Sequence, residues 1–192
     1  MSEEPTFIVS CRDPVGNTVT DIHENTHQLH SELRNKYGNK YNAMYKGNGQ
    51  AFILLEPKTT LSAIAAIIPK PLQGMSYRLY LIQQQQWWNN QPLYLGDELC
   101  AYLAGSRHPQ SETSDYLQAC EFLFYNYYLL TILPYDYISY NNYKQALMWA
   151  TEEVHKYKDN PRVAEHINKF RQFKDLIRPQ FMAEWFDGFY GN

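Results

Sequence analysis

Residues 18–38, TVTDIHENTHQLHSELRNKYG, carry the clearest helix signal of the chain and its densest group of histidines. Thr18 and Asp21 form the T-x-x-D pattern of a capping box, which marks a helix N-terminus. Gly38 suits a helix end because it lacks the side chain that restricts the backbone there. The segment therefore predicts a helix from about Thr18 to Tyr37. One of its faces carries mostly apolar residues at helical spacing, namely Val19, Ile22, Thr26, Leu29 and Leu33.

The segments around this helix predict a small sheet. Before it, TFIVS (6–10) can form a short strand, and RDPVGN (12–17) reads as a turn. After it, NAMYKGNGQAFILLEP (42–57) predicts a β-hairpin whose turn is Gly47-Asn48-Gly49. Further along, SYRLYLIQ (76–83) alternates in hydropathy, and this pattern predicts another strand.

The remaining segments are mostly helical in pattern. TTLSAIAAII (59–68) predicts a short buried helix that stops at Pro69, and YLGDELCAYLAG (94–105) predicts a short helix closed by Gly105. From Ser111 onward, helical patterns cover about 112–133, 139–158 and 161–178, followed by an aromatic C-terminal piece. We therefore expect one α+β domain over residues 1–192, with a small sheet and a dominant helical half.

Composition excludes several classes of protein. The formal net charge is −3 and no run is rich in Lys and Arg, so we expect no nucleic-acid partner. The longest apolar stretches, LSAIAAII and FLFYNYYLLTIL, are too short or too polar for a membrane span, which needs about 20 apolar residues. MSEEPTF lacks the basic and apolar parts of a secretory signal, and an odd number of cysteines, 3, argues against a disulfide framework. These features favour a cytoplasmic protein without a membrane partner.

The segment HENTHQLH (23–30) begins with the motif H-E-x-x-H. On a helix, His23 and His27 are four residues apart and share a face, so both imidazoles can bind one ion. Zn²⁺ binds neutral imidazole nitrogen readily and prefers four ligands. Glu24 is placed to take a proton from zinc-activated water and to pass it to a leaving amine. The spacing therefore predicts a zinc hydrolase.

The same residues are also consistent with a helix edge that binds no metal. His23, His27 and His30 lie along one edge of the apolar face, where histidines can be half-exposed without binding anything. A motif this short also arises by chance in unrelated sequences. Further ligands are therefore needed to decide between a zinc site and a polar helix edge.

A catalytic zinc site needs a third protein ligand, and we expect Glu98 to supply it. Glu98 flanks the apolar face of its predicted helix, where a carboxylate is costly unless it is paired or bound to a metal. Gly96 and Gly105 bound a short helix, which suits a position at the rim of a cleft. Asp97 can hydrogen-bond a ligating histidine from behind. Tyr102, one turn after Glu98, can donate its hydroxyl to a developing oxyanion.

Glu98 can also be understood without a metal, and it has two rivals as the third ligand. The helix dipole alone favours acidic residues in a first turn, which would account for Glu98. Glu121 lies on a predicted helix that is apolar nearly all round, so it also needs a partner. His30 lies on the correct edge of the first helix, but one straight helix rarely supplies three ligands to one ion. We prefer Glu98 to Glu121 because a catalytic zinc needs an open coordination position, which a long apolar helix provides poorly.

Two segments, TDIHENTHQLHSEL (20–33) and PLYLGDELCAYLAG (92–105), together resemble the zincin metallopeptidases of the gluzincin type. In that family an H-E-x-x-H helix supplies two zinc ligands, and a glutamate on a later helix supplies the third. The resemblance implies a zincin-like fold, a peptide or protein substrate, and Zn²⁺ bound by His23, His27 and Glu98. It also implies that Glu24 is the general base.

We therefore expect a zinc-dependent hydrolase, and in particular a metallopeptidase, in which Glu24 activates the water and Tyr102 helps to polarise the scissile carbonyl. The alternative is a non-enzymatic protein-interaction module with a tyrosine-rich helical surface on a zincin-like scaffold. The 17 tyrosines fit either a binding surface or a tyrosine-rich core, and the core is the simpler interpretation. A hydrolase should carry about one zinc ion per chain, whereas the interaction module should carry none.

Overall fold

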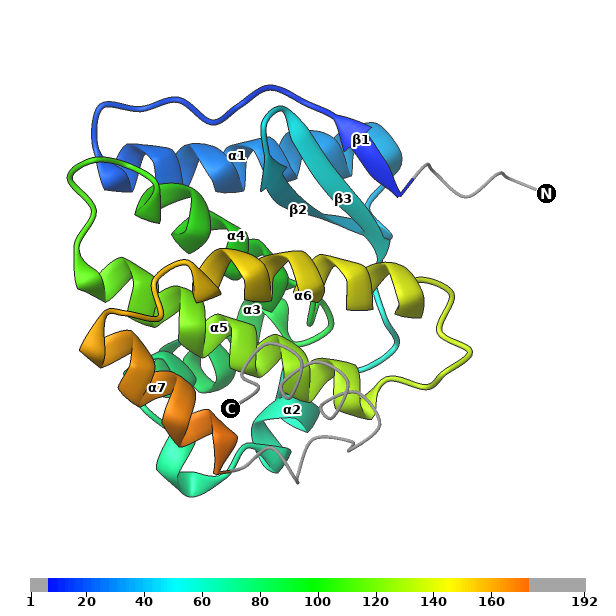
Figure 1. Ribbon diagram of the computed structural model, residues 1–192. Coiled ribbons are helices and arrows are strands. Elements are labelled where there is room, and N and C mark those ends of the chain that lie inside the picture. Colours follow the sequence, from blue (N-terminus) through cyan, green and yellow to red (C-terminus); the bar gives the residue numbers. More distant parts are fainter. Residues whose placement is uncertain (1–6, 173–192) are drawn as a thin grey trace.

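The computed structural model describes residues 7–172 and shows an α+β arrangement, in which a small antiparallel sheet packs among helices (Figure 1). The expected fold class is thus confirmed. The elements are β1 (Ile8–Ser10), α1 (Val19–Tyr37), β2 (Tyr41–Gly47), β3 (Gln50–Leu55), α2 (Leu61–Ile67), η1 (Lys70–Leu72), η2 (Tyr77–Gln83), α3 (Gln85–Trp88), α4 (Tyr94–Ser106), α5 (Thr113–Ile132), α6 (Tyr140–His155) and α7 (Pro161–Arg171).

Helix α1 begins and ends where its local sequence predicts. The Thr18 side chain accepts a hydrogen bond from the Asp21 N–H at 3.0 Å, and Asp21 Oδ2 accepts one from the Thr18 N–H at 3.0 Å. This capping box satisfies backbone donors that have no partner inside the helix. At the other end, Gly38 has φ +105 and donates its N–H to the Arg34 carbonyl at 2.8 Å.

The sheet has three strands in the order β1-β3-β2, and both pairings are antiparallel. The predicted hairpin is present, with Met44 opposite Phe52. Gly47, Asn48 and Gly49 all have positive φ, which explains why the turn needs two glycines and an asparagine. Strand β1, at three residues, is shorter than the predicted 6–10.

Helix α4 is the central element of the fold. It packs against α1, α5, α6 and β2, and among its residues only Tyr102 is not buried. The helix predicted at 94–105 is thus present, but it ends at Ser106 and lies at the centre of the fold, not at the rim of a cleft. Gly105 lies inside the helix, where an added Cβ would meet Val19 Cγ1 at 3.2 Å, so its small size lets α1 approach closely. Gly96 similarly faces Met44, whose sulfur would lie 2.8 Å from an added Cβ.

The predicted strand at 76–83 is wrong, because this segment forms the π-helix η2 (Tyr77–Gln83). Tyr77, Tyr80 and Leu81 face the protein, whereas Leu79 and Ile82 are exposed. A helical turn brings positions 77, 80 and 81 to one side, but a strand would send 80 to the opposite face. The residues that face the protein are thus spaced as in a helix, although the alternation in hydropathy along the segment predicted a strand.

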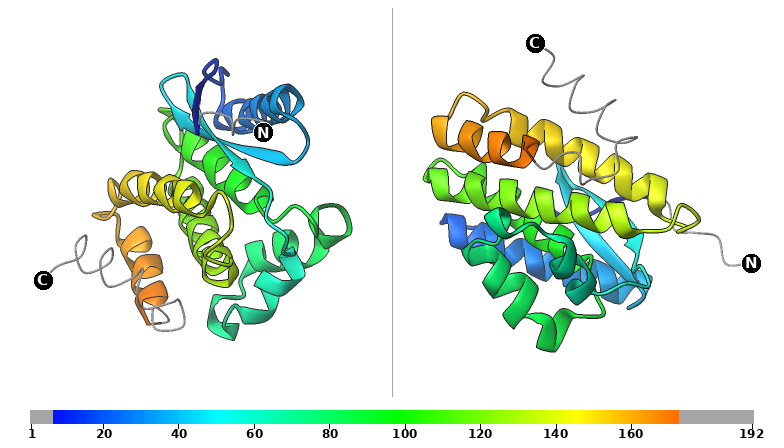
Figure 2. Two further views of the ribbon diagram at one scale, coloured as in Figure 1. Left: turned by 90° about the vertical axis from the view of Figure 1, so that its right-hand side faces the viewer. Right: turned by 90° about the horizontal axis from the view of Figure 1, so that it is seen from below.

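The helical half matches its sequence pattern closely. Predicted helices at 112–133 and 139–158 correspond to α5 and α6, and the helix predicted at 59–68 corresponds to α2. The helix predicted at 161–178 corresponds to α7 over the described residues, while its last part and the aromatic C-terminal piece lie outside them. Helix α5 lies between α6 and α7 on one side and the segment that contains α2 and η2 on the other (Figure 2).

Much of the aromatic content lies in the core. Tyr125, Tyr128 and Tyr143 are the largest of the fully buried side chains in the described part of the chain. A tyrosine-rich core therefore accounts for these residues better than a binding surface does. Between residues 7 and 172, no helix combines the length and the apolar character that crossing a membrane requires.

Candidate metal centre

Helices α1 and α4 pack against each other (Figure 1). Three donor groups from these two helices, those of His23, His27 and Glu98, meet between them. The Nε2 atoms of His23 and His27 lie 3.0 Å apart. The Glu98 carboxylate lies 3.8 Å from His23 Nε2, through Oε2, and 3.7 Å from His27 Nε2, through Oε1. Two ligands of one tetrahedral zinc ion are typically about 3.3 Å apart. The observed separations therefore suit a single small cation.

The chemistry of the donor atoms also fits a metal. Glu98 is 4% exposed, and its Oε2 atom is buried without a hydrogen-bond partner. A buried carboxylate oxygen in this state carries a free-energy cost that a cation would remove. Two imidazole nitrogens and a carboxylate oxygen are the donor set of many catalytic zinc sites.

Asp97 holds the second histidine from behind. Its Oδ1 atom lies 2.7 Å from His27 Nδ1, on the side of the ring away from Glu98 and His23. A hydrogen bond to a carboxylate places the imidazole proton on Nδ1 and leaves Nε2 available as a ligand. The structure thus puts Asp97 in the position that we expected from the sequence.

His30 lies deeper than a ligand of the same ion would. Its side chain is fully buried, and Nδ1 contacts Asp97 Oδ1 at 2.5 Å while Nε2 accepts a hydrogen bond from the Tyr45 N–H at 2.8 Å. Since both ring nitrogens have hydrogen-bond partners, neither is free to join His23 and His27. His27, His30 and Asp97 do form a second compact group of donor atoms, but its short contacts are accounted for by these hydrogen bonds.

Glu121, the other rival for the third ligand, is engaged elsewhere. It lies on α5 and contacts His166 of α7 at 3.3 Å. Within the described residues, it does not belong to either group of clustered donor atoms. The structure therefore brings Glu98, and not Glu121, to the histidine pair.

The electrostatics of the cluster separate the pKa values of its two histidines. Burial and, to a smaller extent, the charge of His27 lower the pKa of His23 to about 4, against the charge of Asp97, which raises it. Burial also acts to lower the pKa of His27, but the hydrogen bond and charge of Asp97, together with Glu98 and Glu24, raise it to about 9. Without a metal at neutral pH, His27 is therefore the cation and its Nε2–H points at the neutral His23.

Glu98 is affected by the same burial. Burial raises its pKa to about 7, against the charge of His27 and a hydrogen bond from Tyr94, both of which lower it. A metal that binds here must displace the proton of His27 and, below about pH 7, that of Glu98. The centre is thus a place where protons and a cation compete for the same atoms.

Glu24 lies at the solvent side of this group. Its side chain is exposed, and its charge contributes to raising the pKa values of both His27 and Glu98. Among the described residues, Glu24 forms no ion pair. This position is consistent with a base that works on a water molecule beside the ligands.

Tyr102, which we expected to act as a hydrogen-bond donor one turn after Glu98, lies next to the first histidine of the motif. Its ring meets His23 edge-on, with the ring centroids 4.5 Å apart. Its hydroxyl lies 3.0 Å from the Tyr80 hydroxyl, which comes from η2. Together, these two hydroxyls form a polar pair beside Glu98, whose charge raises the pKa of both tyrosines in addition to the effect of burial.

Two residues of the centre were not predicted from the sequence. Tyr94 hydrogen-bonds Glu98, and its position four residues earlier on the same helix could have indicated this contact. Tyr80 had no such signal, because the hydropathy of its segment alternates as in a strand. The side chain reaches the centre only because the segment forms a π-helix. π-Helical turns are rare and often occur at functional sites.

Comparison of the chain with protein-family models, with curated proteins and with solved structures finds no match. The assignment of a function therefore rests on the residues and geometry of this centre.

Proposed function

We propose that the protein is a zinc-dependent hydrolase, and in particular a metallopeptidase with a gluzincin-type ligand set. The observation that carries the proposal is the convergence of His23 Nε2, His27 Nε2 and the buried, unpartnered Oε2 of Glu98. These atoms come from two helices that are far apart in the sequence. Their meeting is therefore a product of the fold, which the spacing within one motif cannot explain.

The ligands that we propose are His23, His27 and Glu98, with Asp97 fixing the orientation and tautomer of His27. Zn²⁺ suits this set because it accepts imidazole and carboxylate together and tolerates an open position. When bound, it would supply a Lewis acid that makes a water molecule more acidic and polarises a carbonyl.

The remaining residues supply proton transfer and hydrogen bonds. Glu24 takes a proton from the attacking water and delivers it to the departing amine nitrogen, as the C–N bond of the peptide breaks. Tyr102 and Tyr80, whose hydroxyls are 3.0 Å apart, donate to the oxygen of the former carbonyl as negative charge develops there. The proposed substrate is a peptide or protein, which is what the resemblance to gluzincins implies, and Glu24 would then deliver its proton to the amine leaving group.

The test begins with metal content. Protein purified without chelators should contain about one zinc per chain by elemental analysis, and the double variant His23→Ala/His27→Ala should contain none. Denatured casein, as a mixed substrate, should be cleaved by the zinc-loaded wild type and not by this variant. A folded wild type that takes up no zinc would exclude the hydrolase and favour the non-enzymatic interaction module.

A further inference from the structure

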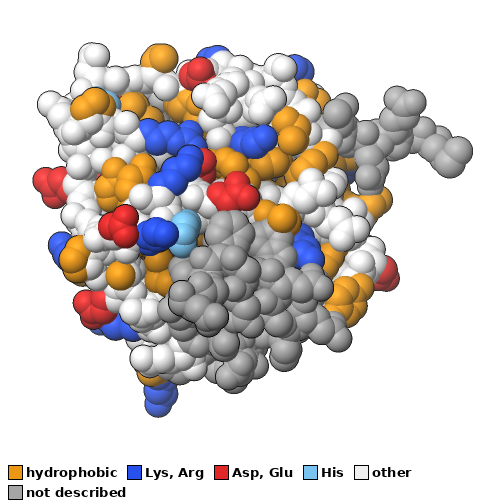
Figure 3. All heavy atoms as spheres, in the orientation of Figure 1, with side chains coloured by type: hydrophobic (Ala, Val, Ile, Leu, Met, Phe, Trp, Pro, Cys, Tyr) orange, Lys and Arg blue, Asp and Glu red, His pale blue; other side chains and the backbone are white. Residues whose placement is uncertain are grey.

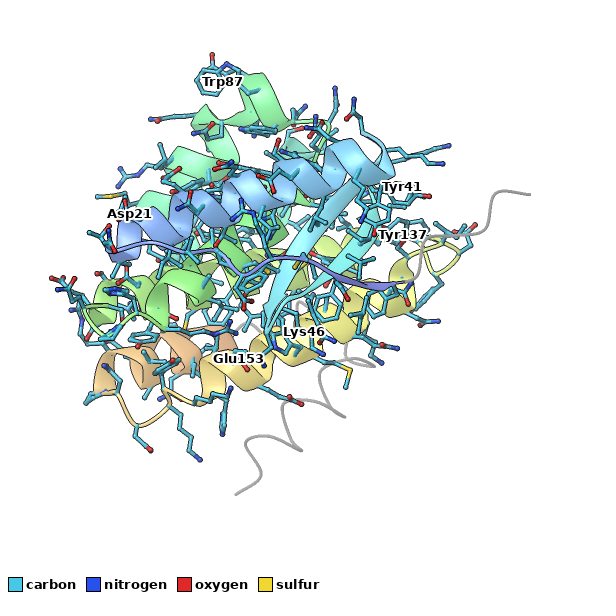
Figure 4. The ribbon with its side chains drawn as sticks, turned by 90° about the horizontal axis from the view of Figure 1, so that it is seen from above. Asp21, Tyr41, Lys46, Trp87, Tyr137 and Glu153 are labelled. Atoms are coloured by element: carbon cyan, nitrogen blue, oxygen red, sulfur yellow. The ribbon has the colours of Figure 1, made fainter. Side chains whose placement is uncertain are left out.

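A concave region lies between the β2–β3 turn and helix α6. This cavity, about 300 Å³ in volume, is at the lower end of the range for ligand pockets, and we call it the hairpin cavity. Its charged lining residues are Lys46, Arg107, Glu153 and Lys156. Figure 4 shows Lys46 and Glu153 close together, and Figure 3 shows basic side chains gathered around acidic ones on the face over α6.

Aromatic rings hold two of these cations side by side. The rings of Phe52 and Trp149 have their centroids 5.7 Å apart. Lys46 Nζ lies 5.8 Å from the Phe52 centroid, and Arg107 Cζ lies 5.9 Å from the Trp149 centroid. Both positions are within the distance at which a cation is attracted to a ring face. The two neighbouring rings thus hold two positive charges close together without neutralising them.

The acidic residue of the cavity, Glu153, is engaged by two of the cations. Glu153 accepts from Arg107 Nη2 at 3.1 Å through Oε2, and from Lys156 Nζ at 2.6 Å through Oε1. Asp13 also attracts Arg107 from outside the cavity, and its Oδ1 accepts hydrogen bonds from the Tyr45 hydroxyl and the Gly49 N–H, both at 2.6 Å. Among the lining residues, three cations share one carboxylate, so the lining is positively charged even when the outside charge of Asp13 is included.

Gly47 keeps the cavity open beside Arg107. A Cβ added at this position would lie 2.7 Å from Arg107 Nη1, and the φ of +104 also favours glycine. Lys46 forms no ion pair within the part of the chain that the structure describes. The cavity therefore presents an ammonium group and a guanidinium group whose attraction for an anion is only partly satisfied.

We propose that the hairpin cavity binds a phosphate group, carried either by a free phosphate or phosphomonoester or by a lipid headgroup. A phosphate anion suits a lining in which cations outnumber carboxylates. Arginine offers a fork of N–H donors to its oxygens, and lysine adds a compact point charge. The site is independent of the metal centre, because the residues that form it are not among the metal donors.

The experiment titrates inorganic phosphate into the full-length protein at constant ionic strength, with binding followed by calorimetry and by NMR shifts of the Trp149 indole. Lys46→Gln should weaken binding about fivefold to tenfold, because it removes one nearby charge from a partly screened site. Lys40→Gln is the matched control, since Lys40 lies over Tyr41 at 5.1 Å but does not line the cavity. It should leave binding unchanged.

Glu153→Gln should change the phosphate affinity in the opposite direction. Removing the competing carboxylate should tighten phosphate binding several-fold, whereas a purely structural role for Glu153 would loosen it. Vesicles of phosphatidylcholine with phosphatidic acid distinguish a lipid source, since wild-type binding to them should exceed that of Lys46→Gln only if headgroups reach the cavity. A wild type that shows no saturable binding of either probe, or a Lys46→Gln variant that binds both as tightly as the wild type, would overturn the proposal.

Discussion

Asp97 Oδ1 lies 2.5 Å from Nδ1 of His30, and the same oxygen contacts Nδ1 of His27 at 2.7 Å. The buried His30 thereby links strand β2, through the Tyr45 N–H, to the carboxylate that orients a proposed metal ligand. Outer hydrogen bonds of this kind commonly set ligand geometry and metal affinity. The third histidine of HENTHQLH thus supports the centre without being a ligand.

Two substitutions at His30 separate its two contacts. His30→Asn keeps a donor near the Nδ1 position, facing Asp97, and His30→Gln keeps an acceptor near the Nε2 position, facing Tyr45. Each variant loses one buried hydrogen bond, so the free energy of unfolding of both should be about 1–3 kcal/mol below that of the wild type. Zinc affinity, measured by competition with a chelating dye, should fall about 10–100-fold in the Gln variant only. Equal zinc affinities in the two variants would show that the Asp97 contact does not matter.

Glu24→Gln should separate metal binding from catalysis. Glu24 is exposed and is not among the clustered donor atoms, so the variant should retain about one zinc per chain. Hydrolysis should fall by a factor on the order of 10² to 10⁴, the usual contribution of a general base. Elemental analysis and a casein assay on the same preparation measure both. Loss of zinc in this variant would mean that Glu24 is a ligand.

Zinc affinity should rise steeply with pH. Between about pH 5 and 7 the metal displaces protons from both Glu98, whose pKa is raised to about 7, and His27, whose pKa is raised to about 9. Affinity should therefore increase about a hundredfold per pH unit below 7 and about tenfold per unit from 7 to 9. Calorimetry in buffers of different ionisation enthalpy would count the released protons. Affinity that is constant from pH 6 to 8 would contradict the proton assignments.

Glu98→Gln should stabilise the metal-free protein in a pH-dependent way. Because the folded-state pKa of Glu98 is raised, its contribution to stability is full below about pH 4.5 and is lost as the pH rises through about 7. Gln does not ionise, so at pH 8 the free energy of unfolding of the variant should exceed that of the wild type by roughly 1–3 kcal/mol. Urea titrations at pH 4.5 and 8 measure the difference, with the exposed Glu152→Gln as a control. A difference that does not grow with pH would argue against the buried carboxylate.

The sequence by itself determined the elements whose signals are local. The Thr18–Asp21 capping box, the Gly-Asn-Gly turn and the periodic helices α5 and α6 depend on interactions among residues a few positions apart. The spacing of His23 and His27 is local in the same sense, because the helix pitch alone puts their side chains on one face. These features could therefore be predicted without knowledge of the tertiary fold.

Only the tertiary structure decided which other residues meet the histidine pair. Glu98 and Asp97 reach it because α4 lies at the centre of the fold, and His30 is a buried support because strand β2 presents a backbone N–H to it. Tyr80 joins the centre because burial on one side favours a π-helix over the strand that its alternation predicts. The physical reason is that such contacts depend on how apolar surfaces pack across the whole chain, which periodicity within a short segment does not specify.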